Sequence, residues 1–116
     1  MSAELKIEIQ EKGNIVIVTI YEDIDLYNVS ALRQAVDKLN NEGKYKQIYN
    51  LKNVKFMDSS GLSIFVKQMS ILKKNNEVLK LACVGDGIKN LFRWTTLNMY
   101  VEIHSTEYEA IQSFNK

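Results

Sequence analysis

Apolar and polar residues alternate near the amino terminus with the period of a half-buried β-strand. Leu5, Ile7 and Ile9 are apolar and are separated by polar residues, and a period of two predicts a strand with one buried face. Residues 12–14 (Lys-Gly-Asn) have the composition of a tight turn, and residues 15–21 are rich in β-branched side chains. The first two predicted strands therefore form an antiparallel hairpin.

A helical period begins at about residue 27 and continues to residue 42. Its apolar positions are spaced so that they share one stripe of a helix, with polar residues on the other side. These apolar residues are Val29, Leu32, Val36 and Leu39. Gly43 follows at the place where a residue with left-handed backbone commonly ends a helix.

The middle of the chain repeats the order strand, helix, strand. Residues 48–51 form a short apolar run, and residues 78–84 are almost continuously apolar, as expected of a strand that is covered on both faces. Between them, residues 62–74 have a helical period and end in two lysines, which suit the negative end of a helix. The predicted apolar face of this helix consists of Leu62, Phe65, Val66, Met69 and Leu72.

The carboxy-terminal third predicts a short helix, a strand and a last helix. Residues 85–87 form a turn in which Asp86 is the expected cap of the short helix, and residues 100–103 form the fifth strand. Thr106 and Glu109 have the spacing of a capping box, which predicts that the last helix begins there. The residues expected to point inward are Ile88, Leu91 and Phe92 in the short helix and Tyr108, Ile111 and Phe114 in the last one.

This order predicts an α/β fold with a mixed, mostly parallel five-stranded sheet and about four helices. Strands that alternate with helices form a layered domain with right-handed crossovers, and we expect residues 1–116 to be one domain. In such a sheet the functional crevice lies beyond the carboxyl ends of the strands. Three turns are predicted there, at residues 22–28, 53–60 and 85–87.

Composition and charge are those of an ordinary soluble domain. The chain has 116 residues, of which 46% are hydrophobic and 25% charged, with a formal net charge of +1. No basic stripe favours nucleic acid, and no apolar run is long enough to cross a membrane. The first residues lack a basic and apolar leader, so the expected location is the cytoplasm.

Cysteine and histidine contribute little candidate chemistry. Cys83 is the only cysteine and His104 the only histidine, and they are far apart in the sequence. A disulfide within the chain is excluded, and neither a zinc site nor a nucleophile–base pair is indicated. We expect Cys83 to be a buried, inert thiol, and no acid near His104 in the sequence suggests a catalytic partner.

Two further features have competing interpretations. Trp94 could form an exposed aromatic contact patch with Phe92 and Tyr100, or it could cover one end of the core. The acidic residues within 22–25 are more typical of a solvated turn than of a site.

The segment Asp58-Ser59-Ser60-Gly61 carries the strongest candidate chemistry. Asp58, Ser59 and Ser60 all favour a helix N-cap, but only one of them can occupy that position, so at least one hydroxyl is left over. A hydroxyl at a helix amino terminus lies near free N–H groups and partial positive charge, where a phosphate is stabilised. The simpler interpretation is a capped helix start without further function.

The same residues have less support for an enzymatic interpretation. Asp25, Asp58 and the two serines are predicted near one edge of the sheet, which would suit hydrolysis or magnesium binding. A serine nucleophile needs a base, however, and the chain has no Gly-x-Ser-x-Gly elbow. It also lacks both common phosphate-binding glycine motifs of nucleotide enzymes.

The segment 58–62 resembles the phosphorylation segment of anti-sigma-factor antagonists, which are stand-alone STAS domains. Residues 25–28 resemble the aspartate-containing turn of that family before its first helix. Residues 88–92, followed by Leu97, resemble its third helix and exit loop. The chain departs from the family at residues 21–24, which replace a glycine-containing turn.

The resemblance implies a non-enzymatic switch that needs no cofactor or metal. Ser59 corresponds to the serine that accepts phosphate, and Asp25, Asp58, Ser60 and Gly61 correspond to supporting or partner-binding positions. The implied partners are an anti-sigma factor that is also a serine kinase with a histidine-kinase-like ATP fold, and a metal-dependent serine phosphatase. A subunit of a stress-sensing or transporter-associated assembly is the alternative.

Overall fold

The computed structural model describes residues 5–115, so the expectation about a leader at residues 1–4 falls outside it. The sheet has five strands in the order β1-β2-β3-β4-β5. The strands are β1 (Ile7–Lys12), β2 (Ile15–Ile20), β3 (Gln47–Asn50), β4 (Leu79–Ala82) and β5 (Val101–His104). The helices are α1 (Val29–Asn41), α2 (Ser59–Lys74), α3 (Asp86–Trp94), the short 3-10 helix η1 (Leu97–Met99) and α4 (Glu107–Ser113).

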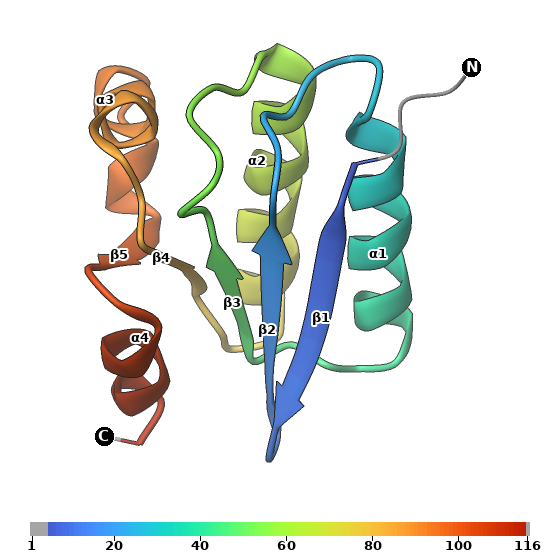
Figure 1. Ribbon diagram of the computed structural model, residues 1–116. Coiled ribbons are helices and arrows are strands. Elements are labelled where there is room, and N and C mark those ends of the chain that lie inside the picture. Colours follow the sequence, from blue (N-terminus) through green and yellow to red (C-terminus); the bar gives the residue numbers. More distant parts are fainter. Residues whose placement is uncertain (1–4, 116) are drawn as a thin grey trace.

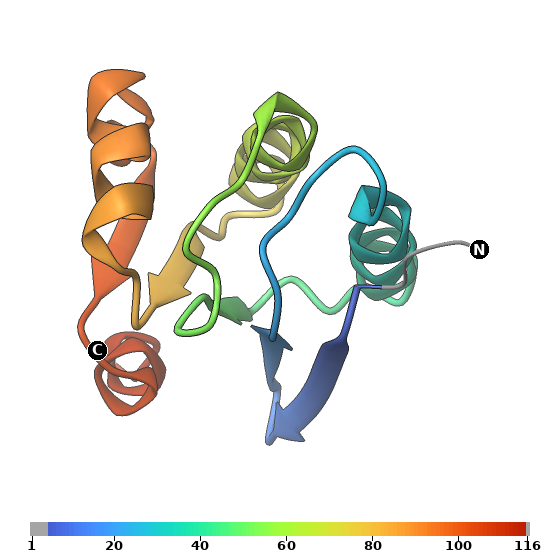
Figure 2. The same ribbon diagram turned by 45° about the horizontal axis from the view of Figure 1, so that its top comes forward.

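The predicted α/β class and mixed sheet are confirmed. β1 pairs antiparallel with β2, and every other neighbouring pair is parallel. Helices α1, α2 and α3 lie on one face of the sheet and α4 lies on the other (Figure 1; Figure 2). The amino end of α2 therefore lies at the edge where the parallel strands end, beside the loop that follows β2 (Figure 2). Within residues 5–115, no helix is long and apolar enough to span a membrane.

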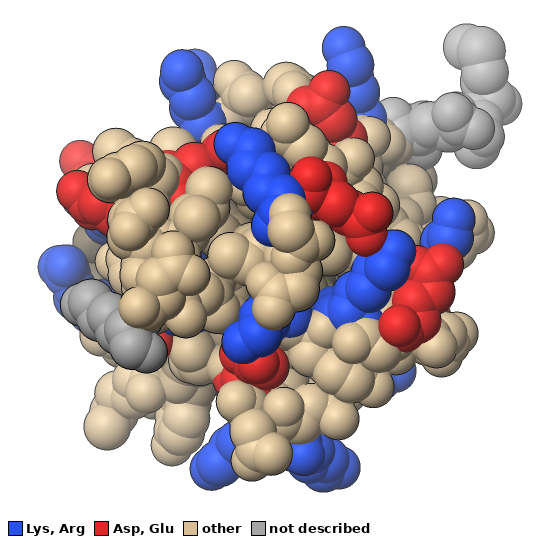
Figure 3. Space-filling model, turned by 90° about the horizontal axis from the view of Figure 1, so that it is seen from below, with Lys and Arg blue, Asp and Glu red and all other residues tan. Residues whose placement is uncertain are grey.

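The face of the molecule where the parallel strands begin carries charges of both signs. Lysine and arginine side chains are interspersed with aspartate and glutamate side chains on it, and no large patch of one sign forms (Figure 3). This distribution gives no extended field that would steer a strongly charged partner to this face.

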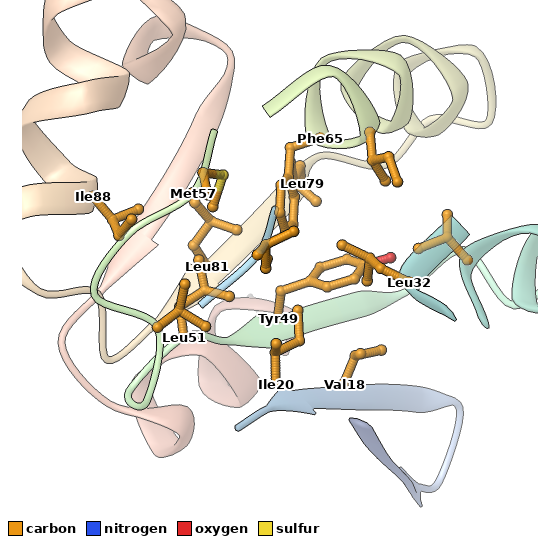
Figure 4. Packing of buried hydrophobic residues seen from close by; sticks show 14 of the residues in the cluster. Val18, Ile20, Leu32, Tyr49, Leu51, Met57, Phe65, Leu79, Leu81 and Ile88 are labelled. Carbon is orange, nitrogen blue, oxygen red and sulfur yellow. The ribbon is translucent and has the colours of Figure 1, made fainter. Parts of the chain in front are cut away.

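The main core lies between the sheet and helices α1, α2 and α3 (Figure 4). Three aromatic rings connect its elements: Phe65 of α2 meets Tyr49 of β3 edge-to-face with centroids 5.4 Å apart, and Phe92 of α3 at 6.5 Å. Such geometry adds to the stabilisation that the buried area alone provides. The four apolar residues predicted for α1 are all buried, and Gly43 has the predicted left-handed backbone, with φ of +71°.

Several predicted inward positions were wrong. Ile9 in the edge strand, Val66 in α2 and Tyr108 in α4 are exposed. In α2 the buried stripe includes Ile64 and Gln68 instead of Val66. The reason is that α2 is rotated so that Gln68 faces Asn40 of α1, with which it exchanges two hydrogen bonds of 2.8 and 2.9 Å.

Other local expectations also need correction. Gly85, not Asp86, is the N-cap of α3, and no side chain caps that helix. Cys83 is only partly buried and has a positive φ of 60°. Trp94 is exposed and does not cover the core, whereas Phe92 is fully buried. The predicted start of α4 is confirmed, because Thr106 accepts the expected hydrogen bond from the amide of Glu109 at 3.0 Å.

Candidate functional site at the amino end of helix α2

Asp58 is the N-cap of α2 and organises the residues around it. One of its carboxylate oxygens, Oδ1, accepts hydrogen bonds from the amides of Ser60 at 2.9 Å and Gly61 at 3.2 Å. The hydroxyl of Ser60 donates to the same oxygen. This hydroxyl bond is the largest cause that holds the pKa of Asp58 below its ordinary value, and the backbone amides act in the same direction.

The spare hydroxyl predicted from the sequence belongs to Ser59. Ser59 is the first residue of α2 and is exposed. Its side chain has no hydrogen bond to another part of residues 5–115, whereas Ser60 is partly buried and directed at Asp58. An external enzyme can therefore reach the oxygen of Ser59 without disturbing the cap.

The loop after β2 and the loop after β3 are joined at this site. Ile24 and Met57 form an isolated parallel bridge, in which the amide of Ile24 donates to Phe56 at 3.1 Å and the amide of Asp58 donates to Ile24 at 3.1 Å. The second carboxylate oxygen of Asp58 accepts from the amide of Leu26 at 3.0 Å. These bonds extend the sheet beyond β2 and β3 and hold the two loops beside the start of α2 (Figure 2).

Asp25 lies in this joined loop, and its carboxylate is engaged with its own turn. It accepts from the amides of Tyr27 at 2.8 Å and Asn28 at 3.1 Å, and Oδ1 of Asn28 accepts in turn from the amide of Asp25 at 2.9 Å. This arrangement is an Asx turn, which shapes the entry into α1. A supporting role of Asp25 toward Ser59 stays a prediction.

The sequence analysis missed the structural role of Asp23. Its carboxylate accepts from the amides of Lys55 at 2.7 Å and Phe56 at 3.1 Å. The acidic turn is therefore not merely solvated, because Asp23 fixes the loop before α2. The sequence signal was only a short-chain aspartate in a turn, and nothing local indicates a partner more than thirty residues away.

Gly61 is required by close packing. A Cβ atom at this position would lie 2.7 Å from Cγ2 of Ile24 and 3.4 Å from Cβ of Met57, and the first of these distances is a clash. The glycine lets the first turn of α2 approach the bridge between the two loops. This is the physical reason for a glycine directly after the two serines.

An apolar rim, which was not predicted from the sequence, lies on the two joined loops. It consists of Leu26, Tyr27 and Phe56, whose exposed fractions are 69%, 80% and 57%. All three lie on the two joined loops, and large exposed apolar side chains that gather at one place are typical of protein contact sites. A signal was present in the sequence, since Leu26, Tyr27 and Phe56 occur in turns where polar residues are common.

Within the described part of the chain, no group of three or more His, Cys, Asp or Glu side chains could hold a metal ion. His104 has an acidic neighbour that the sequence analysis did not expect: Nε2 lies 2.9 Å from Oε1 of Glu102. That pair is part of the β4–β5 surface, and His104 has no hydrogen bond to Ser59 or Ser60.

Comparison with known proteins gives a consistent result. The STAS domain family matches residues 6–110. An anti-sigma-B factor antagonist from Staphylococcus aureus is 31% identical over 106 residues, which cover 90% of this chain and 98% of the relative. A candidate anti-sigma factor antagonist from Thermotoga maritima has a similar structure, with a TM-score of 0.90, 20% identity and 95% of both chains covered. The Bacillus cell fate determinant SpoIIAA, solved in its phosphorylated form, gives a TM-score of 0.76 at 21% identity, with 94% of this chain and 99% of that chain covered.

Proposed function

The chain belongs to the STAS domain family, and on this premise we propose that it is an anti-sigma factor antagonist that is switched off by phosphorylation of Ser59. In this scheme the unphosphorylated protein binds an anti-sigma factor and thereby releases the sigma factor. The observation that carries the proposal is the exposed Ser59 hydroxyl beside the apolar rim of Leu26, Tyr27 and Phe56. The names of the relatives, and the phosphorylated form of SpoIIAA, support it.

The rim gives the unphosphorylated protein a surface to which an apolar partner surface can dock. Burying the three side chains removes apolar area from water, at roughly 25 cal/mol for each Å². The hydrogen bonds that the carboxylates of Asp23 and Asp58 accept from backbone amides of the two loops hold the rim in place before binding. A partner therefore does not need to order these loops, which lowers the entropic cost of association.

Phosphorylation would change the charge of this surface without disrupting the fold. A phosphate on Ser59 adds roughly −1.5 to −2 charges at pH 7. The helix amino terminus stabilises that charge within the free protein, whereas the ionised Asp58 adds to the negative field. A docked apolar or acidic partner would then face an uncompensated charge, which costs several kcal/mol and weakens binding by orders of magnitude.

The proposed partners are those that the resemblance to anti-sigma-factor antagonists implies. The kinase is the anti-sigma factor itself, a serine kinase with a histidine-kinase-like ATP fold, and a metal-dependent phosphatase restores the free serine. The antagonist supplies the accepting hydroxyl and performs no catalysis of its own. It needs no cofactor or metal for this role.

The direct test is to incubate the protein with ATP and a candidate anti-sigma factor kinase and to locate any phosphate by mass spectrometry. We expect a gain of one phosphate on the peptide that contains Ser59. The Ser59→Ala variant should gain none, and Ser63→Ala, which changes an exposed serine one turn further along α2, should be phosphorylated like the unchanged protein. Phosphate on another residue, or equal labelling of Ser59→Ala, would contradict the proposal.

A further inference from the structure

A groove of about 710 Å³ lies between the second half of α2 and the segment that leads into β5. One wall is a single stripe of α2 that runs from Val66 to Lys73, and Val78 lies where the chain enters β4. The other wall is formed by Leu97, Met99, Tyr100, Val101 and Glu102. Its volume is within the range of small-molecule sites in proteins.

The groove is remote from the phosphorylation site. Lys73 is fourteen residues beyond Ser59 in the same helix, which corresponds to about 21 Å along the axis. The groove therefore opens toward the end of the molecule where the parallel strands begin. Ser59 lies at the opposite end of α2, so binding in the groove does not depend on the proposed switch.

Most of the lining is apolar, and its polar members are Ser70, Lys73, Glu77 and Glu102. Val66 and Met69 face the apolar residues of η1 and β5, and Ser70 and Lys73 follow on the same helical stripe. Met99 and Tyr100 are exposed on the opposite wall. A ligand that fits this lining has a large apolar part and a polar group.

The charges of the groove define the sign of that head. Its two acidic residues already have cationic partners: Glu77 pairs with Lys46 at 3.1 Å, and Glu102 pairs with Lys80 at 2.8 Å. Lys73 has no ion pair with another described residue within 4.0 Å. The remaining uncompensated charge is positive, and it favours an anion.

The carbonyl groups at the end of α2 do not neutralise the charge of the Lys73 ammonium. The carbonyl of Leu72 accepts from the amides of Asn75 at 3.0 Å and Glu77 at 2.8 Å, and the carbonyl of Ile71 accepts from the side chain of Asn75 at 2.8 Å. The negative end of the helix is thus already capped by hydrogen-bond donors. Lys73 is exposed, so its ammonium is accessible to the charged group of a ligand.

We propose that this groove binds a long-chain monocarboxylate, with the acyl chain along Val66, Met69 and Met99 and the carboxylate at Lys73. The apolar chain provides most of the affinity by leaving water. The carboxylate pairs with Lys73 and fixes the direction of the chain in the groove. The proposal gives the protein a lipid-binding site in addition to the proposed phosphorylation site.

The test is a calorimetric titration with oleate below its micelle-forming concentration, with oleyltrimethylammonium as the probe of opposite charge. We expect saturable binding of one oleate per chain and weaker binding of the cation. Lys73→Gln should weaken oleate binding by about tenfold, as loss of a charge-assisted contact does. Val66→Asp, which places a charge in the apolar part of the groove, should weaken it further.

Lys74→Gln is the matched control, because Lys74 is the next residue of the same helix turn but does not line the groove. It should bind oleate like the unchanged protein. Equal losses in Lys73→Gln and Lys74→Gln, no saturable binding, or equal affinity for the cation would overturn the proposal. Binding only to anionic vesicles would also overturn it, because a membrane surface would then be the occupant. A dimer in sedimentation experiments that Val66→Asp separates would overturn it too, because the occupant would then be a second copy of the chain.

Discussion

The carboxylate of Asp58 accepts a hydrogen bond of 3.0 Å from the backbone amide of Leu26, thirty-two residues earlier in the chain. Its other oxygen caps α2 by accepting from the amides of Ser60 and Gly61. One side chain thus positions both the apolar rim and the helix start that carries Ser59. The surface that is proposed to bind a partner and the residue proposed to be modified are therefore parts of one hydrogen-bonded unit.

Asp58→Ala should loosen this unit. The amides of Leu26 and Gly61 would lose their carboxylate acceptor, and hydrogen bonds to charged groups are stronger than neutral ones. We expect hydrogen exchange at these two amides to be faster by about tenfold or more, as measured by NMR. Asp86→Ala is the control, since Asp86 caps nothing with its side chain, and exchange at both amides should stay unchanged in it.

Gly61→Ala should destabilise the fold by about 1–3 kcal/mol, which is typical of overpacking. The added methyl group would lie 2.7 Å from Cγ2 of Ile24, so the bridge between the two loops has to shift. Urea unfolding measures the loss. A double-mutant cycle with Ile24→Ala, which removes that Cγ2 atom, should show a favourable coupling between the two changes. Strictly additive effects would mean that the clash does not cause the loss.

The sequence predicted the order of strands and helices well, because the period of apolar residues is a local property. The α1 stripe from Val29 to Leu39 needed no information about its neighbours. The buried stripe of α2 did need information about its neighbours, because apolar residues make up more than a third of that helix. Gln68 faces α1 through its hydrogen bonds to Asn40, and Val66, two residues away and therefore on nearly the opposite side of the helix, is exposed.

The candidate site was predictable in its centre and not in its surroundings. Asp58, Ser59 and Ser60 are consecutive residues, and capping rules apply to them directly. The partners of Asp23 and Asp58 in the other loop are set by the tertiary fold, so no local pattern indicates them. The apolar rim was missed for a related reason: which turn residues remain exposed depends on how the two loops pair.

Gln68→Leu should destabilise the protein despite the greater hydrophobicity of leucine. Gln68 is buried and also donates to Oε1 of Gln47 at 2.8 Å. Leucine would leave the buried polar groups of Gln47 and Asn40 short of partners, at a cost of about 1–3 kcal/mol in the free energy of unfolding. Gln34→Leu, at an exposed position of α1, is the control in the same urea experiment and should change stability by less than about 0.5 kcal/mol.

Ser59→Asp should weaken binding of the anti-sigma factor and leave the thermal unfolding midpoint almost unchanged. The added carboxylate imitates part of the phosphate charge at an exposed position. Ser59→Ala should bind like the unchanged protein and should not be released when ATP is added, because it lacks the accepting hydroxyl. Surface plasmon resonance with immobilised anti-sigma factor separates the two effects. Loss of binding by Ser59→Ala would show that the hydroxyl itself is a contact, in conflict with the proposed switch.

Binding to the same immobilised partner should also depend on the apolar rim. Tyr27→Ser removes the most exposed aromatic side chain of that rim, and aromatic anchors commonly carry a large share of interface energy. We expect its affinity to fall by about tenfold or more. Tyr108→Ser changes another strongly exposed tyrosine, on α4, and should leave the affinity unchanged if the rim is the docking surface.

Glu102 should make stability depend on acid pH. Its partial burial disfavours the charged form, but hydrogen bonds from Lys80 and His104 outweigh burial, so its pKa in the folded protein is lower than the ordinary 4.5. Because the pKa of Glu102 is lower in the folded protein than in the unfolded chain, its ionised carboxylate stabilises the fold at pH values above the unfolded pKa. This stabilisation is lost as the pH falls through the folded pKa. Glu102→Gln should therefore lower the urea midpoint more at pH 7 than at pH 3.

The burial of the Lys80 ammonium explains why its ion pair with Glu102 stabilises this edge of the sheet. Its side chain is only 5% exposed, and besides Glu102 it contacts the hydroxyl of Ser113 at 2.7 Å and the ring of Phe114 at 4.4 Å. Losing the carboxylate leaves a nearly buried cation with neutral partners alone, which is costly. The double variant Lys80→Met/Glu102→Gln should thus recover much of the stability that Glu102→Gln loses at pH 7, because no buried charge remains. An equal loss at both pH values, or no recovery in the double variant, would show that the ion pair does not stabilise the β4–β5 edge.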